Sequence, residues 1–146
     1  MTVEDRAVDG SNTTAAEHVR QYLESAGASV DHPAQGHLII LYTTGRVSGD
    51  IRRTPLRFFE DGEGLIVAAS YRGSPDHPDW YLNLLDDPHV WVRKDSDLFP
   101  ARSVVIEDDE RDRIWDTVVA IAAPQFVEYQ ANTTRVIPLV RLLPSG

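Results

Sequence analysis

The sequence predicts an α+β domain in which about six mostly antiparallel strands curl into a barrel with flanking helices. Three β-rich runs, residues 38–42, 52–59 and 65–70, follow one another with glycine-containing turns between them, as consecutive antiparallel strands do. Strand patterns again follow one another later in the chain. Such runs favour a barrel or curled sheet over a doubly wound parallel fold, which needs strict strand–helix alternation.

The chain begins with a segment that has no strand pattern. Residues 1–12 are charged and poor in large apolar side chains, which predicts a flexible tail. A helix is predicted over residues 15–26, capped by Thr13 and Thr14 with Glu17 near its third position. Because 146 residues are the size of one domain, residues 13–146 are expected to form a single domain.

The middle of the chain predicts a loop, a short helix and two strands. Residues 71–79 contain two prolines and predict a polar loop, and residues 80–85 predict the helix. Residues 89–94 and 98–106 predict strands, and Pro100 indicates that the second lies at a sheet edge or carries a bulge.

The end of the chain predicts two helices and a last strand. Acidic residues cap a helix over residues 108–122, a short helix follows over residues 126–131, and residues 136–143 form the strand. The expected buried stripe of the longer helix is Ile114, Trp115, Val118 and Ile121.

The composition narrows the classes of function. The formal charge of −9 argues against nucleic acid as a partner, because a nucleic-acid binder needs a basic face. The absence of cysteine excludes thiol nucleophiles and disulfides, and His77 and Asp79 lack clustered partners, so no metal is expected. No stretch reaches the roughly 20 apolar residues of a membrane span and the start is not a signal peptide, so we expect a cytoplasmic protein.

One stretch departs from this acidic balance. Between residues 43 and 58, four arginines stand against the single acid Asp50, which is a local charge of +3. The turn that begins this stretch is either an ordinary hairpin or a site where backbone N–H groups, Arg46 and Ser48 hold a phosphate or a carboxylate.

Two further groups of side chains are of chemical interest. Trp80 and Tyr81 with Asn83 form either plain core or one wall of a pocket for a planar ligand. Arg57 and Arg72 are expected to be solvated, which is the ordinary state of arginine.

Three motifs, taken in order, resemble those of the actinobacterial deazaflavin-dependent nitroreductases and quinone reductases. They are residues 43–49 with 53–56, residues 67–70 with 78–84, and residues 129–130 with 134–138. That family has a split β-barrel fold like that of the flavin-binding pyridoxamine-phosphate oxidases. The resemblance implies the 8-hydroxy-5-deazaflavin coenzyme F-420, whose phosphate and polyglutamate tail suit the local positive charge.

The resemblance also implies roles for individual residues. The phosphate and tail would meet Arg46, Ser48 and the backbone at Val47, with charge added by Arg52 or Arg53. The deazaflavin ring would lie along Thr54, Pro55, Leu56, Val67, Ala68, Ala69, Ser70 and Tyr71. The ring site would be closed by Trp80, Tyr81 and Asn83, and the substrate would lie against Phe126 and Tyr129.

Three positions depart from the family pattern. Val47 and Tyr71 stand where lysines are common, which removes cations from the tail site, although Arg72 can restore one. Phe126 lacks the hydroxyl of the usual tyrosine, so activation of nitroimidazoles does not follow from the resemblance.

The implied activity is hydride transfer from reduced F-420 to a quinone, an activated enone or a nitroaromatic. Ser70 and Tyr129 are candidates for the proton donor, although neither has a sequence-level partner. Two alternatives stay open: an FMN-dependent enzyme of the same fold, and a non-catalytic F-420-binding protein. The expected partners are a small hydride acceptor and a second copy in a homodimer. The N-terminal helix could pack on the barrel, cover the pocket or touch a membrane surface.

Overall fold

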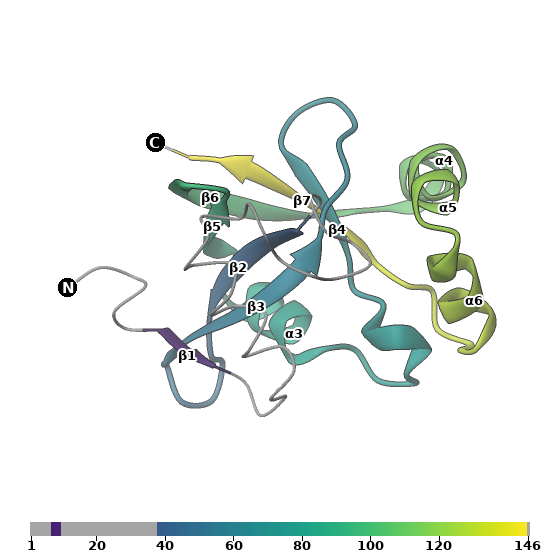
Figure 1. The fold of residues 1–146 in the computed structure, drawn as a ribbon. Coiled ribbons are helices and arrows are strands. Elements are labelled where there is room, and N and C mark those ends of the chain that lie inside the picture. The colour runs from purple at the N-terminus through teal and green to yellow at the C-terminus, as the bar shows by residue number, and fades with distance from the viewer. Residues whose placement is uncertain (1–6, 10–37, 146) are drawn as a thin grey trace.

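The computed structural model describes residues 7–9 and 38–145, and its main feature is a seven-stranded sheet (Figure 1). The strands are β1 (Ala7–Asp9), β2 (Leu38–Thr44), β3 (Ile51–Arg57), β4 (Leu65–Ala68), β5 (His89–Lys94), β6 (Asp97–Ile106) and β7 (Leu139–Pro144). They lie in the order β1-β3-β2-β5-β6-β7-β4, and all pairs are antiparallel except β1 with β3. The predicted α+β class with mostly antiparallel strands is confirmed.

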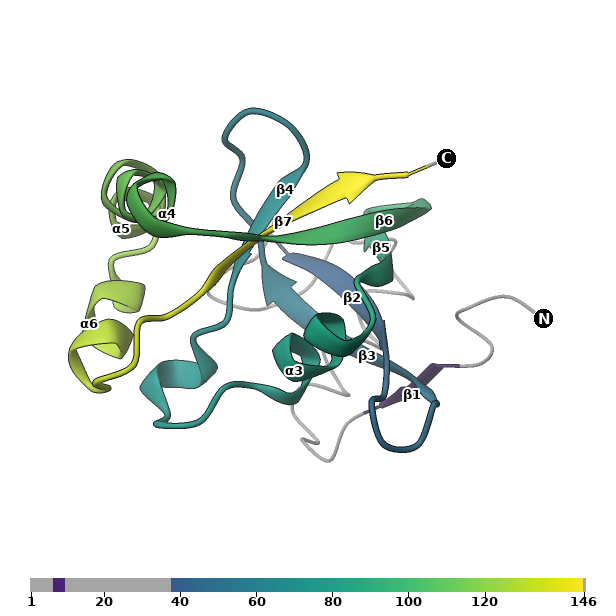
Figure 2. The same ribbon diagram turned by 180° about the vertical axis from the view of Figure 1, so that it is seen from behind.

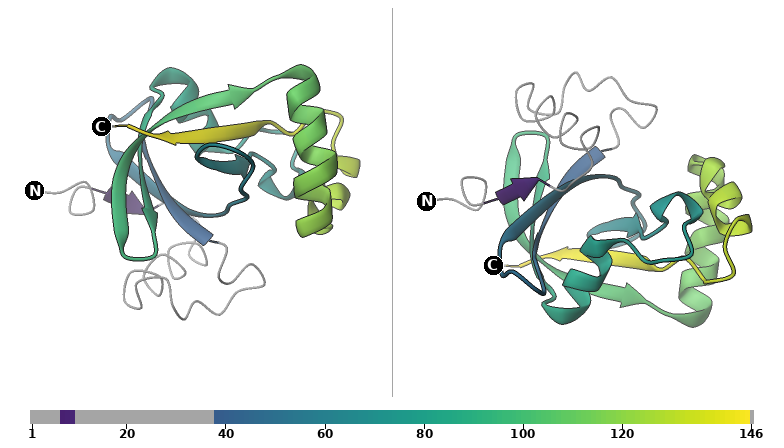
Figure 3. Two further views of the ribbon diagram at one scale, coloured as in Figure 1. Left: turned by 90° about the horizontal axis from the view of Figure 1, so that it is seen from above. Right: turned by 90° about the horizontal axis from the view of Figure 1, so that it is seen from below.

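The sheet curls until its two sides meet. Phe59, just beyond β3, and Ile66 of β4 form an antiparallel bridge in which each N–H donates to the other's carbonyl oxygen at 2.8 Å. The views from above and below show the strands wrapping around an interior (Figure 3). Strand twist and this bridge together turn the open sheet into a barrel.

Helices flank the barrel on two sides. The helix α3 (Asp79–Asp86) packs beside β2, after a single 3-10 turn, η1 (Tyr71–Gly73). A longer helix is built from α4 (Asp108–Ile114), a π-helical segment η2 (Trp115–Val119) and α5 (Ala120–Ala122), and α6 (Gln125–Ala131) follows it. Figure 2 shows α4, α5 and α6 together at one end of the sheet, apart from α3.

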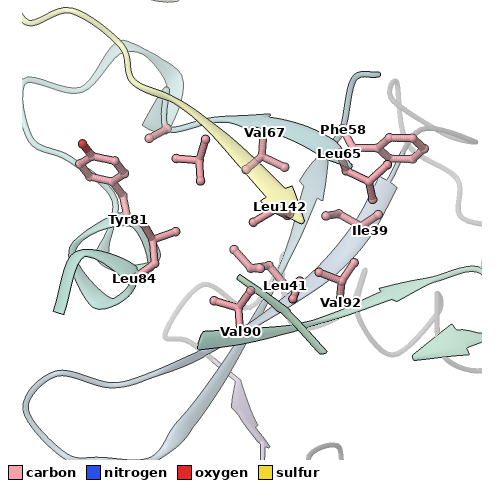
Figure 4. Close-up of a cluster of buried hydrophobic side chains, with 13 residues drawn as sticks. Ile39, Leu41, Phe58, Leu65, Val67, Tyr81, Leu84, Val90, Val92 and Leu142 are labelled. Atoms are coloured by element: carbon pink, nitrogen blue, oxygen red, sulfur yellow. The ribbon is translucent and has the colours of Figure 1, made fainter. Parts of the chain in front are cut away.

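The alternation of side chains along β4 divides the core into two parts. Leu65 and Val67 point into the barrel, among side chains of β2, β5 and β7 (Figure 4). Ile66 and Ala68 point the other way, into a second cluster formed with the long helix and α6. The end of β4 therefore lies where the barrel and the helices meet.

One detail of the predicted strands was wrong. β4 pairs with β7, and its only bridge near β3 is the one at Phe59, so the first three strands of the barrel are not a simple meander. The prediction for Pro100 holds as a local edge: β6 runs without a bulge, but β7 pairs only with residues 101–106, so Pro100 is paired with a strand only on the β5 side.

The long helix departs from its predicted stripe at one position. The N–H of Ala120 donates to the carbonyl of Trp115, five residues earlier, which is the π-helical pattern. The wider turn shifts the buried face, so Val119 is buried whereas Ile121 is 73% exposed. Ile114 and Trp115 are buried as predicted.

The predictions for the N-terminal region can be followed only in part. Ala7–Asp9, from the predicted flexible tail, form β1 and pair with residues 51–53. The rest of that tail and the predicted helix over residues 15–26 lie outside the described residues. Among the helices within residues 38–145, none combines the length and the apolar character needed to cross a membrane.

Candidate functional site

The turn between β2 and β3 is a compact, exposed hairpin. The N–H of Gly45 donates to the carbonyl of Asp50 at 2.7 Å, and the N–H of Gly49 donates to the carbonyl of Gly45 at 2.9 Å. Gly49 has a φ of 76°, which a residue with a side chain adopts only at a cost. Val47 at the tip is 92% exposed, so this part of the turn projects into solvent.

Arg46 ties this hairpin to α3. Its backbone N–H and its Nη1 both donate to Asn83 Oδ1, at 3.1 and 2.8 Å, and its Nη2 lies 3.3 Å from Asp79 Oδ1. Asn83 is only 4% exposed, and its Nδ2 donates to Thr43 Oγ1 at 3.4 Å. Arg46 and Asn83 therefore set how the hairpin sits on the helix, a role that the sequence did not indicate.

β3 carries the remaining arginines of the basic stretch. Arg52 lies 4.0 Å from the carboxylate of Asp50, which is a loose, exposed ion pair. β1 pairs with β3 only at residues 51–53, so among the described residues no strand covers the same edge from Thr54 onwards. Pro55 lies on that stretch and has no N–H, so it leaves no unpaired donor there.

A cavity of about 190 Å³ lies between β3, the end of β4 and α6, and we call it the β3–α6 pocket. Six of the residues that the resemblance assigns to the ring or the substrate line it: Pro55, Leu56, Ala68, Ser70, Phe126 and Tyr129. The structure thus brings together residues that the chain separates by up to 74 positions (129 minus 55).

The pocket has an aromatic wall. The rings of Phe59 and Phe126 meet edge to face with centroids 5.7 Å apart, and those of Phe126 and Tyr129 do so at 5.4 Å. The guanidinium of Arg57 lies over the Phe59 ring, 5.3 Å from its centroid. Edge-to-face pairs hold the rings in fixed orientations, so this wall is pre-formed.

Arg57 and Arg72 also line the pocket; Arg72 is exposed, as expected, whereas Arg57 is half-buried. Arg57 Nη2 makes a long hydrogen bond of 3.4 Å to the carbonyl of Ala122, and burial lowers the pKa of the Arg57 guanidinium. The strand pattern placed Arg57 correctly, but only the packing of the helices shows that its side chain is half-buried.

A left-handed turn separates β4 from α3. Tyr71, Arg72 and Gly73 have φ values of 45°, 55° and 81°. Left-handed backbone is unfavourable for the two residues that have side chains. A Cβ on Gly73 would lie 2.6 Å from the carbonyl oxygen of Tyr129, so the turn also packs tightly against α6.

Arg135 holds this turn in place. Its guanidinium donates to the carbonyl oxygens of Ala69 at 3.0 Å, Ser70 at 2.8 Å and Ser74 at 2.9 Å. It also lies 3.3 Å from His77 Nδ1. Arg135 belongs to the C-terminal motif. These hydrogen bonds show that this motif residue stabilises the turn, which the spacing of the motif could not show.

A second hub fixes the segment that leads into β7. Arg111 Nε and Nη2 donate to the carbonyl of Ile137 at 3.1 and 2.7 Å, and Nη2 also donates to Gln130 Oε1 at 3.1 Å. Gln130 in turn accepts the N–H of Ile137 at 2.9 Å and donates to the carbonyl of Arg135 at 2.8 Å. The motif residue Gln130 therefore connects the helices to Arg135.

A second, more open cavity of about 520 Å³ lies beside the left-handed turn. Its lining residues are Tyr71, Pro75, Asp76, His77, Asp79 and Leu82. Burial and the Arg135 guanidinium lower the pKa of His77, whereas the Asp76 carboxylate raises it. The His77 ring packs on Tyr81 with centroids 4.8 Å apart.

Several predicted ring contacts do not line the β3–α6 pocket. Val67 and Ala69 are fully buried in the barrel core, as the strand alternation requires. Tyr81 is buried in the same core, and burial raises the pKa of its phenol. Trp80 packs against that core, and the Asn83 amide is engaged with Arg46.

The chain matches one known protein family in its sequence. A family model described as "F420H(2)-dependent quinone reductase" matches residues 14–144. A protein of that name from Mycobacterium tuberculosis (strain ATCC 25618 / H37Rv) is 34% identical over 106 residues, which are 71% of each chain.

Solved structures show the same likeness. One described as an F420-H2 dependent reductase (FDR-A) is 32% identical with a TM-score of 0.66, over 73% of this chain and 94% of that chain. Another, described as a domain-swapped dimer, is 30% identical with a TM-score of 0.68, over 87% and 95% of the two chains. These neighbours confirm the split β-barrel fold.

Proposed function

The chain belongs to the F420H(2)-dependent quinone reductase family, and on this basis we propose that it reduces a quinone or related electron-poor acceptor with reduced F-420. The observation that supports the proposal most directly is the β3–α6 pocket. Residues that the resemblance assigns to the cofactor ring and to the substrate converge there, at one end of a strand that carries arginines at its other end.

The residues present fit this cofactor in the chemistry and the spacing of their donors. A strand rises about 3.3 Å per residue, so Arg52 lies about 10–13 Å along β3 from Pro55 and Leu56. A planar ring in the pocket and a phosphate beside Arg52 would occupy the two ends of that span. The pocket offers aromatic side chains to a planar ring, while the basic hairpin suits a phosphate and a polyanionic tail.

We assign the phosphate and tail to Arg52, Arg53 and the turn around Val47 and Ser48. Arg46 already holds Asn83 and Asp79, so its role in this proposal is to position the turn as well as to supply positive charge.

The ring would lie against Thr54, Pro55, Leu56, Ala68 and Ser70, with Tyr71 at its edge. Val67, Ala69, Trp80, Tyr81 and Asn83 would support this surface from behind, because the structure engages them in the core or on α3.

When bound, reduced F-420 supplies a hydride to the acceptor, which also takes up one proton and is reduced by two electrons. The chain's own part is to bind, orient and exclude water. Phe126 and Tyr129 provide a rigid wall against which an acceptor ring can stack. The hydroxyls of Ser70 and Tyr129 belong to lining residues of the pocket and can pass a proton, and water can do the same.

Titration of the purified protein with oxidised F-420 and with FMN, followed by ligand fluorescence, tests the cofactor. Consumption of reduced F-420 in the presence of quinones, enones and nitroaromatics then tests turnover. We expect selective F-420 binding and quinone reduction. Selective FMN binding would place the protein in the flavin branch of the fold, and tight F-420 binding without turnover would make it a carrier.

A matched pair of variants tests the phosphate end of the site. Arg52→Met should weaken F-420 binding about tenfold, the scale of a charge-assisted hydrogen bond. Arg102→Met, at an exposed arginine of β6, should leave it unchanged. Equal effects of the two substitutions would argue against a specific phosphate site on β3.

We also propose that residues 13–146 fold as one domain and that the protein is a homodimer. The solved structure described as a domain-swapped dimer supports the second point. Light scattering during size-exclusion chromatography should give twice the mass of the 16.3 kDa chain. A monomeric mass at micromolar concentration would contradict the proposal.

A further inference from the structure

The β3–α6 pocket combines two cations with a lining that contains no described acidic side chain. Its polar lining residues are Arg57, Ser70, Arg72, Gln125 and Tyr129. Both guanidiniums stay charged at physiological pH. Since the whole chain carries a formal charge of −9, an acid-free cavity with two arginines is a local reversal of the protein's charge.

The side chain of Arg57 is half-buried and has no charged partner among the described residues. Its Nε is buried and has no hydrogen-bond partner among the described residues, and none of their acidic side chains forms an ion pair with Arg57. Its one hydrogen bond within the described chain is the long contact with the Ala122 carbonyl. The lowered pKa of Arg57 has the sign expected when a cation loses water without gaining an anion. A partly desolvated guanidinium of this kind loses less hydration than a fully exposed one when it binds an anionic group.

Arg72 is the second cation, and its backbone is strained. It has a φ of 55° in the left-handed turn, and its side chain makes no hydrogen bond or ion pair with the part of the chain that the structure describes. Arg135 holds the carbonyls on either side of this turn. Backbone strain that is maintained by such contacts is typical of functional sites.

We propose that this pocket selects acceptors that carry a negative group beside the reducible ring, and that Arg57 and Arg72 hold that group. The acceptors would be quinones or enones with a carboxylate, a sulfonate or an ionised hydroxyl. The planar fork of arginine binds such groups in a bidentate manner, while Phe126 and Tyr129 stack on the ring. The inference rests on the proposed function and adds no new redox step, since the anionic group is unchanged by the reduction.

The first test compares two quinones in each variant. 1,4-Naphthoquinone-2-sulfonate carries a negative charge and menadione does not. For every variant, the ratio of their kcat/KM values is divided by the wild-type ratio, so the intrinsic reactivities of the quinones cancel. We expect Arg57→Met to lower the ratio about tenfold and Arg72→Met about threefold or more, while Arg102→Met leaves it unchanged. Arg57→Lys keeps the charge and should retain part of the preference.

The second test measures binding without any reaction. Calorimetric titration with 2-naphthoate and with the neutral 2-naphthamide, in the presence of oxidised F-420, should show a preference for the carboxylate that is lost in Arg57→Met. Circular dichroism and the F-420 affinity of each variant show whether the fold and the cofactor site remain intact.

The outcomes separate this inference from the proposed function. If both quinones are reduced but the ratio is the same in all variants, the anionic selectivity is refuted and the function stands. If Arg57→Met instead weakens F-420 binding with the ratio unchanged, the arginines serve the cofactor, which also refutes the inference. If neither quinone is reduced, the function fails, and the naphthoate titration still decides whether the pocket selects anions.

Discussion

Replacing Arg135 with methionine should destabilise the protein and loosen the turn between its two cavities. The guanidinium makes three hydrogen bonds to backbone carbonyls, at 2.8, 2.9 and 3.0 Å. Methionine keeps most of the side chain's apolar length but none of its donors. Of the three carbonyls, that of Ser70 would keep a bond from the N–H of Gly73 at 2.9 Å.

The size of the effect follows from these bonds. A hydrogen bond from a charged donor contributes about 1.5–3 kcal/mol, so three bonds give an upper limit of about 5–9 kcal/mol. Arg135 is only half-buried, so in the variant water can replace some of the lost hydrogen bonds. Release of the backbone strain at Tyr71 and Arg72 would offset about 1–3 kcal/mol of the remaining loss. We expect the free energy of unfolding to fall by about 2–4 kcal/mol, which a domain of ordinary stability survives.

Urea unfolding followed by tryptophan fluorescence measures this change, because Trp80, Trp91 and Trp115 lie in different parts of the fold. Tryptic cleavage after Arg72 gives a local readout and should become faster in the variant. Arg102→Met is the control and should change stability by less than about 0.5 kcal/mol. A loss below about 0.5 kcal/mol in Arg135→Met, with unchanged proteolysis, would show that these bonds do not hold the turn.

Three further outcomes are expected, each checked by urea unfolding. Gly73→Ala should lower the free energy of unfolding by at least about 2 kcal/mol, because the new Cβ would lie 2.6 Å from a backbone carbonyl oxygen of α6. Gly49→Ala should lower it by about 1 kcal/mol, because no atom lies within 4 Å of the new Cβ and only the positive φ is unfavourable. Equal losses for the two variants would contradict this reasoning. Burial, helped by a neighbouring guanidinium, lowers the pKa of His77 below 6.5, so the unfolded chain binds more protons and stability should fall as the pH drops through about 6.5. His77→Gln should reduce that fall, and an identical pH profile would refute the assignment. Asn83→Ala removes the acceptor of two hydrogen bonds from Arg46, so it should lower the free energy of unfolding by about 1–3 kcal/mol and weaken F-420 binding. Asn83→Asp keeps an acceptor oxygen and should lower the free energy of unfolding by less.

Much of the local structure was predictable because it depends on short-range patterns. The strands near residues 38–44 and 89–94, the turns at Gly45 and Gly62, and the helices around residues 80–85 and 126–131 all follow from alternation, glycine and proline. The π-helical segment was not predictable, because the standard helical period carries no signal for an inserted residue, and Ile121 was therefore wrongly placed in the buried stripe.

The candidate site was likewise predictable only in part. The basic stretch around Arg52 and the family motifs were visible in the chain itself, and Phe126 and Tyr129 followed from the resemblance. The partial burial of Arg57 was not visible, because it depends on the tertiary contact between Phe59 and Phe126 of α6.

The sequence by itself determined the class of fold, the family and the charge of the hairpin, since these depend on composition, period and motif order. Only the tertiary structure decided which side chains are available to a ligand. Arg46 and Arg135 look like free cations in the chain, yet three-dimensional packing commits much of their hydrogen bonding to Asn83 and to backbone carbonyls, while Arg57 and Arg72 are left facing the pocket. Long side chains can reach several neighbours, and only the fold determines which neighbour is within hydrogen-bonding distance.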